Sequence, residues 1–71
     1  MQMRIELNGE AVQISNSSPV LLRDLLRSLG YSDLRGLAVA VNEELVPRSS
    51  WDLKEISEGE RVLIVTPSQG G

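Results

Sequence analysis

The first half of the chain changes from a hydrophobic period of two to a period of about 3.6. Apolar and polar residues alternate over residues 3–7, which is typical of a strand buried on one face. Asn8 and Gly9 follow, and this pair favours a type I′ hairpin turn because both central residues of that turn need positive φ. We therefore predict a β-hairpin whose second strand covers residues 11–14.

A helix is predicted after the hairpin, ending near Leu29. Ser18 is a suitable N-cap, and Pro19 suits the first helical position because its missing N–H has no partner to lose there. One apolar stripe runs along the predicted helix, formed by Leu22, Leu25, Leu26 and Leu29. Gly30 follows the stripe and favours the left-handed conformation that ends many helices.

Three further strands are predicted in the second half of the chain. The predicted elements are a strand at residues 37–41, a short strand at residues 45–46 that Pro47 ends, one helical turn within residues 49–56 and a last strand at residues 61–66. A turn at residues 42–44 joins the first two of these strands. Trp51 is expected to pack in the core rather than to anchor a partner.

The predicted fold class is α+β, because one helix cannot cover both faces of a sheet of four or five strands. The simplest packing places the leucine stripe on one face of a mixed sheet and leaves the other face open to solvent. This arrangement is a roll of the β-grasp type. We expect one domain at residues 1–66, followed by a flexible C-terminal tail at residues 67–71 that ends in two glycines.

The open face of this sheet is predicted to be apolar. The strand segments at residues 37–41 and 62–65 carry apolar side chains at both parities, so one parity must point away from the helix. An exposed apolar patch of this kind usually marks a docking surface. We expect partner enzymes to bind there; the pattern leaves open which parity faces them.

Composition excludes most kinds of enzyme. The 71 residues contain no cysteine and no histidine, which removes disulfides, thiolate nucleophiles, the usual zinc sites and a Ser-His-Asp triad. The sequence has no glycine-rich phosphate loop, and no carboxylate pair has the spacing of an acid–base or metal site. We therefore expect a chain that is not an enzyme and that binds no cofactor or metal itself.

Charge and hydropathy exclude two further classes of binding partner, nucleic acid and membranes. Seven Lys and Arg against ten Asp and Glu give a net charge of −3, which opposes binding to nucleic acid. The longest apolar run, at residues 37–41, is far shorter than the roughly 20 residues that a membrane span needs. Residues 1–7 do not resemble a signal peptide. The expectation is a cytoplasmic protein that binds neither nucleic acid nor a membrane.

The end of the sequence carries the strongest chemical signal. Gly70 and Gly71 follow a predicted strand and a short spacer, and without Cβ atoms they form the thinnest possible peptide, which can enter another protein's active site. A terminal carboxylate is ionised near neutral pH, since its pKa is about 3.3–3.7. It reacts only after conversion to an activated acyl species such as an acyl-adenylate. Because the chain has no nucleotide site, a partner must activate it.

Several short motifs follow one another in a distinctive order. They are the Asn8-Gly9 hairpin, the leucine helix, Val39-Ala40-Val41-Asn42, Leu45-Val46-Pro47-Arg48, Trp51 and the final Gly70-Gly71. Together they resemble the ThiS family of sulfur carriers in thiamine biosynthesis. The resemblance covers nearly the whole chain and implies a ubiquitin-like β-grasp fold.

The resemblance also implies a carrier mechanism centred on Gly71. A ThiF-type adenylyltransferase would use ATP to adenylate the Gly71 carboxylate, with Gly70 giving access to that partner's active site. Sulfur from a cysteine desulfurase route would then replace the AMP and leave a C-terminal thiocarboxylate. Thiazole synthase, ThiG, would take this sulfur into the thiazole ring of thiamine.

Three other functions stay open at this point. Pro67-Ser68-Gln69 resembles the spacer of the related molybdopterin-synthase small subunit, MoaD, which would carry sulfur in the same way to a different acceptor. A ubiquitin-like modifier would instead be joined through Gly71 to lysines of other proteins. A plain interaction domain would not use the two glycines at all.

Overall fold

The computed structural model describes residues 2–14, 19–31 and 33–67 of the chain. Its elements, in chain order, are β1 (Met3–Leu7), β2 (Glu10–Ile14), β3 (Val20–Leu21), α1 (Leu22–Ser28), β4 (Ala38–Val41), β5 (Glu44–Val46), the 3₁₀ helix η1 (Arg48–Ser50), β6 (Glu55–Ile56) and β7 (Arg61–Val65). Within the described ranges no helix combines the length and the apolar character that crossing a membrane requires.

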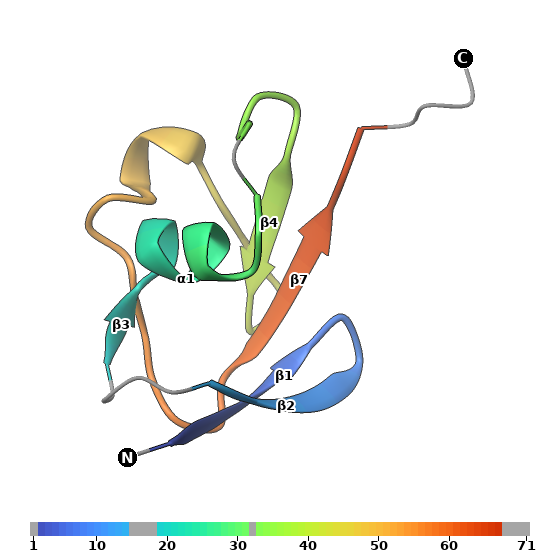
Figure 1. The fold of residues 1–71 in the computed structure, drawn as a ribbon. Coiled ribbons are helices and arrows are strands. Elements are labelled where there is room, and N and C mark those ends of the chain that lie inside the picture. Colours follow the sequence, from blue (N-terminus) through green and yellow to red (C-terminus); the bar gives the residue numbers. More distant parts are fainter. Residues whose placement is uncertain (1, 15–18, 32, 68–71) are drawn as a thin grey trace.

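Five strands form one mixed sheet in the order β2-β1-β7-β4-β5. The last strand, β7, lies at the centre, where it pairs in parallel with β1 and antiparallel with β4 (Figure 1). The β1–β2 and β4–β5 pairs are antiparallel hairpins. The expected mixed sheet with one main helix is therefore confirmed, and its strand number is the upper of the two that the sequence predicts.

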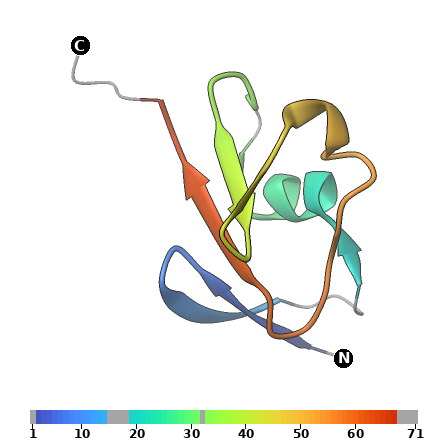
Figure 2. The ribbon, with the colours of Figure 1, turned by 180° about the vertical axis from the view of Figure 1, so that it is seen from behind.

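The helix covers one face of this sheet, as predicted (Figures 1 and 2). Leu22, Leu25 and Leu26 of the leucine stripe are fully buried, and Leu29 packs at the edge of the core. They belong to one buried cluster with residues of the strands, and no polar or charged residue among those described is buried. Its other members are Met3, Ile5, Val20, Val39, Val41, Val46, Trp51, Ile56, Val62 and Ile64.

The start of the helix differs from the prediction. The helix begins at Leu22 and not at Pro19, because Val20 and Leu21 form β3 and pair with β6 in a separate two-stranded sheet. The first helical N–H groups donate to loop carbonyls, Leu22 N to Lys54 O at 2.7 Å among them. This loop takes the place of a side-chain cap, and the predicted cap, Ser18, lies outside the described residues.

The turns and the position of Trp51 agree with the predictions from the sequence. Asn8 and Gly9 have φ of 51° and 85°, which fits the predicted type I′ turn. Gly30, at φ 99°, ends α1. Trp51 lies in the core, where its indole Nε1–H donates to the carbonyl of Val46 at 2.9 Å. Core packing is thus confirmed for this residue.

Candidate functional site

The structure settles which residues of the central strands face solvent. Val62 and Ile64 of β7 point into the core, whereas Leu63 and Val65 are each 51% exposed on the other face. The register pairs Ala40 with Leu63 on one side and with Leu45, which is 73% exposed, on the other. A single apolar area spans three strands, and we call it the apolar patch: Ala38, Ala40, Leu45, Leu63 and Val65.

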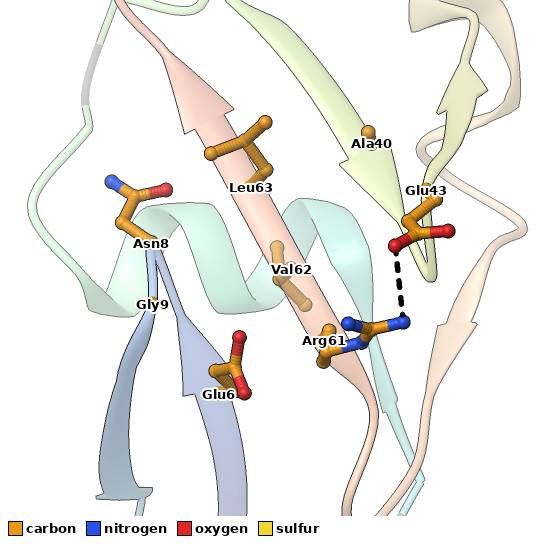
Figure 3. Close-up of a pocket in the computed structure, with 8 residues that line it drawn as sticks. All are labelled: Glu6, Asn8, Gly9, Ala40, Glu43, Arg61, Val62 and Leu63. Atoms are coloured by element: carbon orange, nitrogen blue, oxygen red, sulfur yellow. Dashed lines mark hydrogen bonds and ion pairs between the residues drawn. The ribbon is translucent and has the colours of Figure 1, made fainter.

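A shallow groove of about 190 Å³ opens beside this patch, between the β1–β2 turn and β4 (Figure 3). Ala40 and Leu63 of the patch line it together with Val62. The remaining lining residues are Gly9 and four with polar or charged side chains, Glu6, Asn8, Glu43 and Arg61. Such an opening suits one apolar side chain of a partner, with charged groups around it.

The charged rim is held by contacts between the β4–β5 turn and the start of β7, which lie side by side. Arg61 and Glu43 form an ion pair at 3.3 Å (Figure 3). Asn42 accepts a hydrogen bond from the backbone N–H of Arg61 at 3.0 Å and donates from its amide nitrogen to Glu60. These bonds tie the β4–β5 turn to the first residue of β7, so the rim is fixed relative to the patch.

Asn8 has a structural task that the sequence alone did not reveal. Its backbone N–H donates to the carbonyl of Val62 at 2.9 Å, and there the pairing of β1 with β7 ends. The next N–H of β7 on this side belongs to Ile64, and it donates to Asn8 Oδ1 at 2.7 Å. The side chain therefore continues the ladder one step beyond the strand, toward the end of β7.

The predicted site residues at the end of the chain, Gly70 and Gly71, lie outside the described residues. The last strand ends at Val65, and Pro67 is the last residue that the structure describes. The boundary placed between residues 66 and 67 stays a prediction. In the sequence the glycines follow β7, the strand that carries two of the five residues of the apolar patch, Leu63 and Val65.

Residues 2–14, 19–31 and 33–67 do not contain a catalytic arrangement. Within them no group of three or more Asp, Glu, His or Cys side chains is placed to hold a metal ion, and no polar or charged residue is buried. The hydrogen bonds from Arg35 lower the pKa of Asp33, and the same contact raises the pKa of Arg35. Both groups are fully exposed, so this pair is a loop contact and not a reactive centre.

Comparison with known proteins identifies the family. A model described as the ThiS family matches residues 2–71. The chain belongs to the ThiS family. Consistent with this, it is 30% identical over 69 residues to the sulfur carrier protein ThiS of Escherichia coli (strain K12), in an alignment that covers 97% of this chain and all of that protein. Members of the ThiS family are small sulfur carriers of thiamine biosynthesis and not enzymes, as the sequence predicts.

Solved structures agree with the predicted fold. A crystal structure of the thiamine biosynthesis protein ThiS from Geobacter metallireducens superposes with a TM-score of 0.84 at 22% identity, covering 97% of this chain and all of that one. An NMR structure of a thiamine biosynthesis protein from the same organism gives a TM-score of 0.82 at 22% identity, covering 97% and 88% of the two chains. The ubiquitin-like β-grasp prediction is confirmed.

Two features of this ThiS-family chain had only weak signals in its sequence. Leu45 lies in a predicted strand, but two adjacent apolar residues before Pro47 do not show which of them faces solvent. The bond from Ile64 N–H to Asn8 Oδ1 joins residues 56 positions apart, and a turn motif predicts a backbone conformation rather than such a partner.

Proposed function

We propose that this chain carries sulfur on the carbonyl carbon of Gly71. A ThiF-type adenylyltransferase transfers AMP from ATP to the Gly71 carboxylate, with release of pyrophosphate. Sulfur arrives through a cysteine desulfurase route as a persulfide, whose terminal sulfur bonds to the Gly71 carbonyl carbon as the bond to AMP breaks. A thiol reductant then cleaves the sulfur–sulfur bond, which forms a disulfide and releases the thiocarboxylate. The resulting thiocarboxylate delivers sulfur to thiazole synthase, ThiG. The chain itself binds no cofactor, because ATP is used by its partner, and the whole cycle takes place in the cytoplasm.

Family membership is the observation that carries this proposal. The match extends through residue 71, so it includes Gly70 and Gly71. The alignment with the Escherichia coli sulfur carrier covers the whole of that relative. A glycine pair suits the step because it is thin enough to enter an active site and accepts backbone conformations closed to other residues. Residues 2–14, 19–31 and 33–67 contain no cysteine and no group of side chains placed to hold a metal ion, which favours activation by a partner.

The apolar patch is the proposed docking surface for both partners. Leu45, Leu63 and Val65 expose more than half of their surface on one face, and burying them is favourable by about 25 cal/mol per Å² of apolar area. The patch continues along β7 to Val65, so a partner bound to it lies beside the end of the strand that precedes the glycines in the sequence. One surface cannot hold two enzymes at once. The adenylyltransferase must therefore leave before the thiazole synthase binds.

Intact-mass spectrometry tests the carrier step. The chain is incubated with ATP, a ThiF-type adenylyltransferase and a sulfur source, and the exchange of one C-terminal oxygen for sulfur is expected. A variant without Gly71 should stay unchanged in mass under the same conditions. If an established ThiS carrier is charged in the same mixture and the intact chain is not, the proposal is wrong.

A pair of leucine variants tests the docking surface. Leu63→Asp places a charge in the apolar patch, whereas Leu53→Asp places the same charge at an exposed leucine outside it, which is 81% accessible. Both positions are exposed, so both variants should fold. We expect Leu63→Asp to weaken binding to the adenylyltransferase at least about tenfold, as loss of a buried interface anchor does. Equal affinities of the two variants would exclude this face.

The spacer Pro67-Ser68-Gln69 favours one second candidate, sulfur delivery to molybdopterin synthase. The carrier chemistry at Gly71 is the same, and only the acceptor differs. Pull-down of the charged chain with ThiG and, separately, with the large subunit of molybdopterin synthase distinguishes the two. Retention by ThiG alone supports the thiazole pathway. Isopeptide-linked products in cells would instead indicate a protein modifier.

A further inference from the structure

Two turn asparagines hydrogen-bond to β7 through their side chains, and only one of them is followed by glycine. Asn8 Oδ1 accepts one backbone N–H of β7 at 2.7 Å, and Asn42 Oδ1 accepts another at 3.0 Å. Both asparagines have nearly the same positive φ, 51° and 52°. Gly9 follows Asn8, whereas Glu43 follows Asn42. The two sites therefore share a conformation and a type of contact and differ in the next residue.

An asparagine that precedes glycine is open to a reaction that needs no enzyme. The backbone nitrogen of the next residue attacks the side-chain Cγ, and the Cγ–Nδ2 bond breaks to leave a cyclic imide. Hydroxide takes the proton of the attacking N–H, and the departing nitrogen takes a proton from water and leaves as ammonia. Water then opens the ring at either carbonyl carbon, which gives aspartate or isoaspartate. Glycine favours the attack because it has no Cβ to crowd the nitrogen.

The reacting groups of Asn8 and Gly9 are accessible to water. Both residues are exposed at the tip of the β1–β2 hairpin, beside β7 (Figure 3). A Cβ atom built on Gly9 would meet no other atom within 4 Å. Within residues 2–14, 19–31 and 33–67 the N–H of Gly9 has no hydrogen-bond partner. Hydroxide therefore reaches the attacking nitrogen, and any protection of this site must come from the asparagine side.

The contact with β7 supplies that protection. The N–H of Ile64 holds Asn8 Oδ1, and the backbone N–H of Asn8 donates to the carbonyl of Val62 at 2.9 Å. Ring closure requires rotation about the Cα–C and Cα–Cβ bonds of Asn8, so that Cγ comes over the nitrogen of Gly9. Neither bond turns far without pulling Oδ1 away from Ile64. The reaction therefore has to wait until this hydrogen bond opens.

We propose that Asn8 is a site of deamidation that the seated β7 strand keeps closed. The reaction consumes only water and hydroxide, so it requires neither a partner nor the carrier function. Aspartate at position 8 keeps an oxygen that accepts the N–H of Ile64. Isoaspartate instead adds one carbon to the main chain inside a two-residue turn, which disturbs the hairpin register and withdraws that acceptor. Either product also adds a negative charge to the groove that Glu6 lines.

Removing one N–H group tests the protection. The 71-residue chain is made by chemical synthesis, with an α-hydroxy acid in place of Ile64, which keeps the side chain and changes the N–H to an ester oxygen. The matched control is the same exchange at Leu63. Successive N–H groups of a strand point to opposite sides, so the N–H of Leu63 points to Ala40 of β4. Each ester chain loses one bond of β7, and only the first frees Asn8.

The folded chains are incubated at mildly alkaline pH, and peptide mapping by mass spectrometry counts aspartate and isoaspartate at each asparagine. The ester at position 64 should deamidate at Asn8 about two- to tenfold faster than wild type, the factor expected for loss of one hydrogen bond. The ester at position 63 should change this rate less. Asn42 should stay intact in all chains, because the side chain of Glu43 crowds its attacking nitrogen. Equal rates at Asn8 in the two ester chains overturn the inference.

A second measurement needs no variant. Urea below the unfolding transition should raise the rate of Asn8 deamidation and the exchange rate of the Ile64 amide by the same factor, since both need the same opening. Fully unfolded wild type should deamidate at Asn8 faster than any folded chain. If the folded chain reacts as fast as the unfolded one, or if the unfolded chain does not react at Asn8, the proposal is wrong.

Discussion

Replacing Asn8 by glycine tests whether one side chain completes the central sheet. The amide of Ile64 donates to Asn8 Oδ1 at 2.7 Å, in a partly buried setting, at the point where β1 has already ended. Glycine accepts the φ of 51° found at position 8 at least as readily as asparagine. Asn8→Gly therefore removes the acceptor without straining the turn.

The expected loss follows from the burial of this contact. A hydrogen bond contributes about 0.5–1.5 kcal/mol net, and a donor left unsatisfied costs about 1–3 kcal/mol when buried. For a partly buried donor we expect a fall in the free energy of unfolding of about 1–2 kcal/mol. In a domain of this size that corresponds to a decrease in Tm of about 5–12 °C.

Urea unfolding and amide hydrogen exchange measure the effect globally and locally. The amide of Ile64 should exchange faster in Asn8→Gly than in the wild type, and by more than amides in β4 do. Asn8→Asp is the matched control, because it keeps an oxygen acceptor and tolerates positive φ. The reasoning is refuted if Asn8→Gly unfolds within about 0.5 kcal/mol of wild type, the scatter of ordinary surface substitutions, and Ile64 exchange is unchanged.

Three further predictions concern single residues. Trp51→Phe should lower the free energy of unfolding by about 0.5–1.5 kcal/mol, because it removes the buried hydrogen bond from the indole Nε1–H to the Val46 carbonyl. Urea titration followed by circular dichroism measures this. Glu43→Gly should raise the free energy of unfolding by about 0.5–1 kcal/mol. The reason is that the strain of a side chain at φ 72° exceeds the stabilisation from the exposed ion pair with Arg61. An unchanged Tm would contradict this. Arg35→Ala should raise the pKa of Asp33 toward 3.8, as followed by NMR.

The sign of the pH effect at Asp33 follows from the direction of its shift. Its carboxyl pKa is lowered in the folded chain by the hydrogen bonds from Arg35. The favourable contact is therefore fully present above the ordinary value of 3.8 and is lost as the pH falls through the lower folded value. The Arg35→Ala variant should lack this acid dependence of the 33–37 loop, and wild-type titration at the ordinary value would contradict the assignment.

Local patterns predicted most of the strands and the helix stripe. The alternation over residues 3–7 and the leucine spacing reflect which side is buried, and burial is what forms these elements. The helix start was wrong because Pro19 has the local chemistry of a first helical residue, whereas Val20 gains more by pairing with Ile56 across the fold. That partner lies 36 positions away in the sequence, beyond the reach of any local pattern.

The sequence predicts that an exposed apolar face exists but does not predict which residues form it. Two apolar strands beside a single helix require an exposed apolar face, and the parity that faces outward follows only from the register of β4 against β7. The glycine pair at 70 and 71 is known from the sequence alone, because both residues lie outside the described ranges.

Because β7 is the central strand and also precedes the C-terminal glycines, folding of the sheet is linked to the proposed carrier function. Because this strand is the last to be made and also the only partner shared by β1 and β4, the sheet cannot close before it is added. A copy without a seated β7 exposes two unpaired strand edges. The strand that leads to the glycines is thus also the one that completes the sheet, so a chain whose β7 is not in place has neither a closed sheet nor its apolar patch.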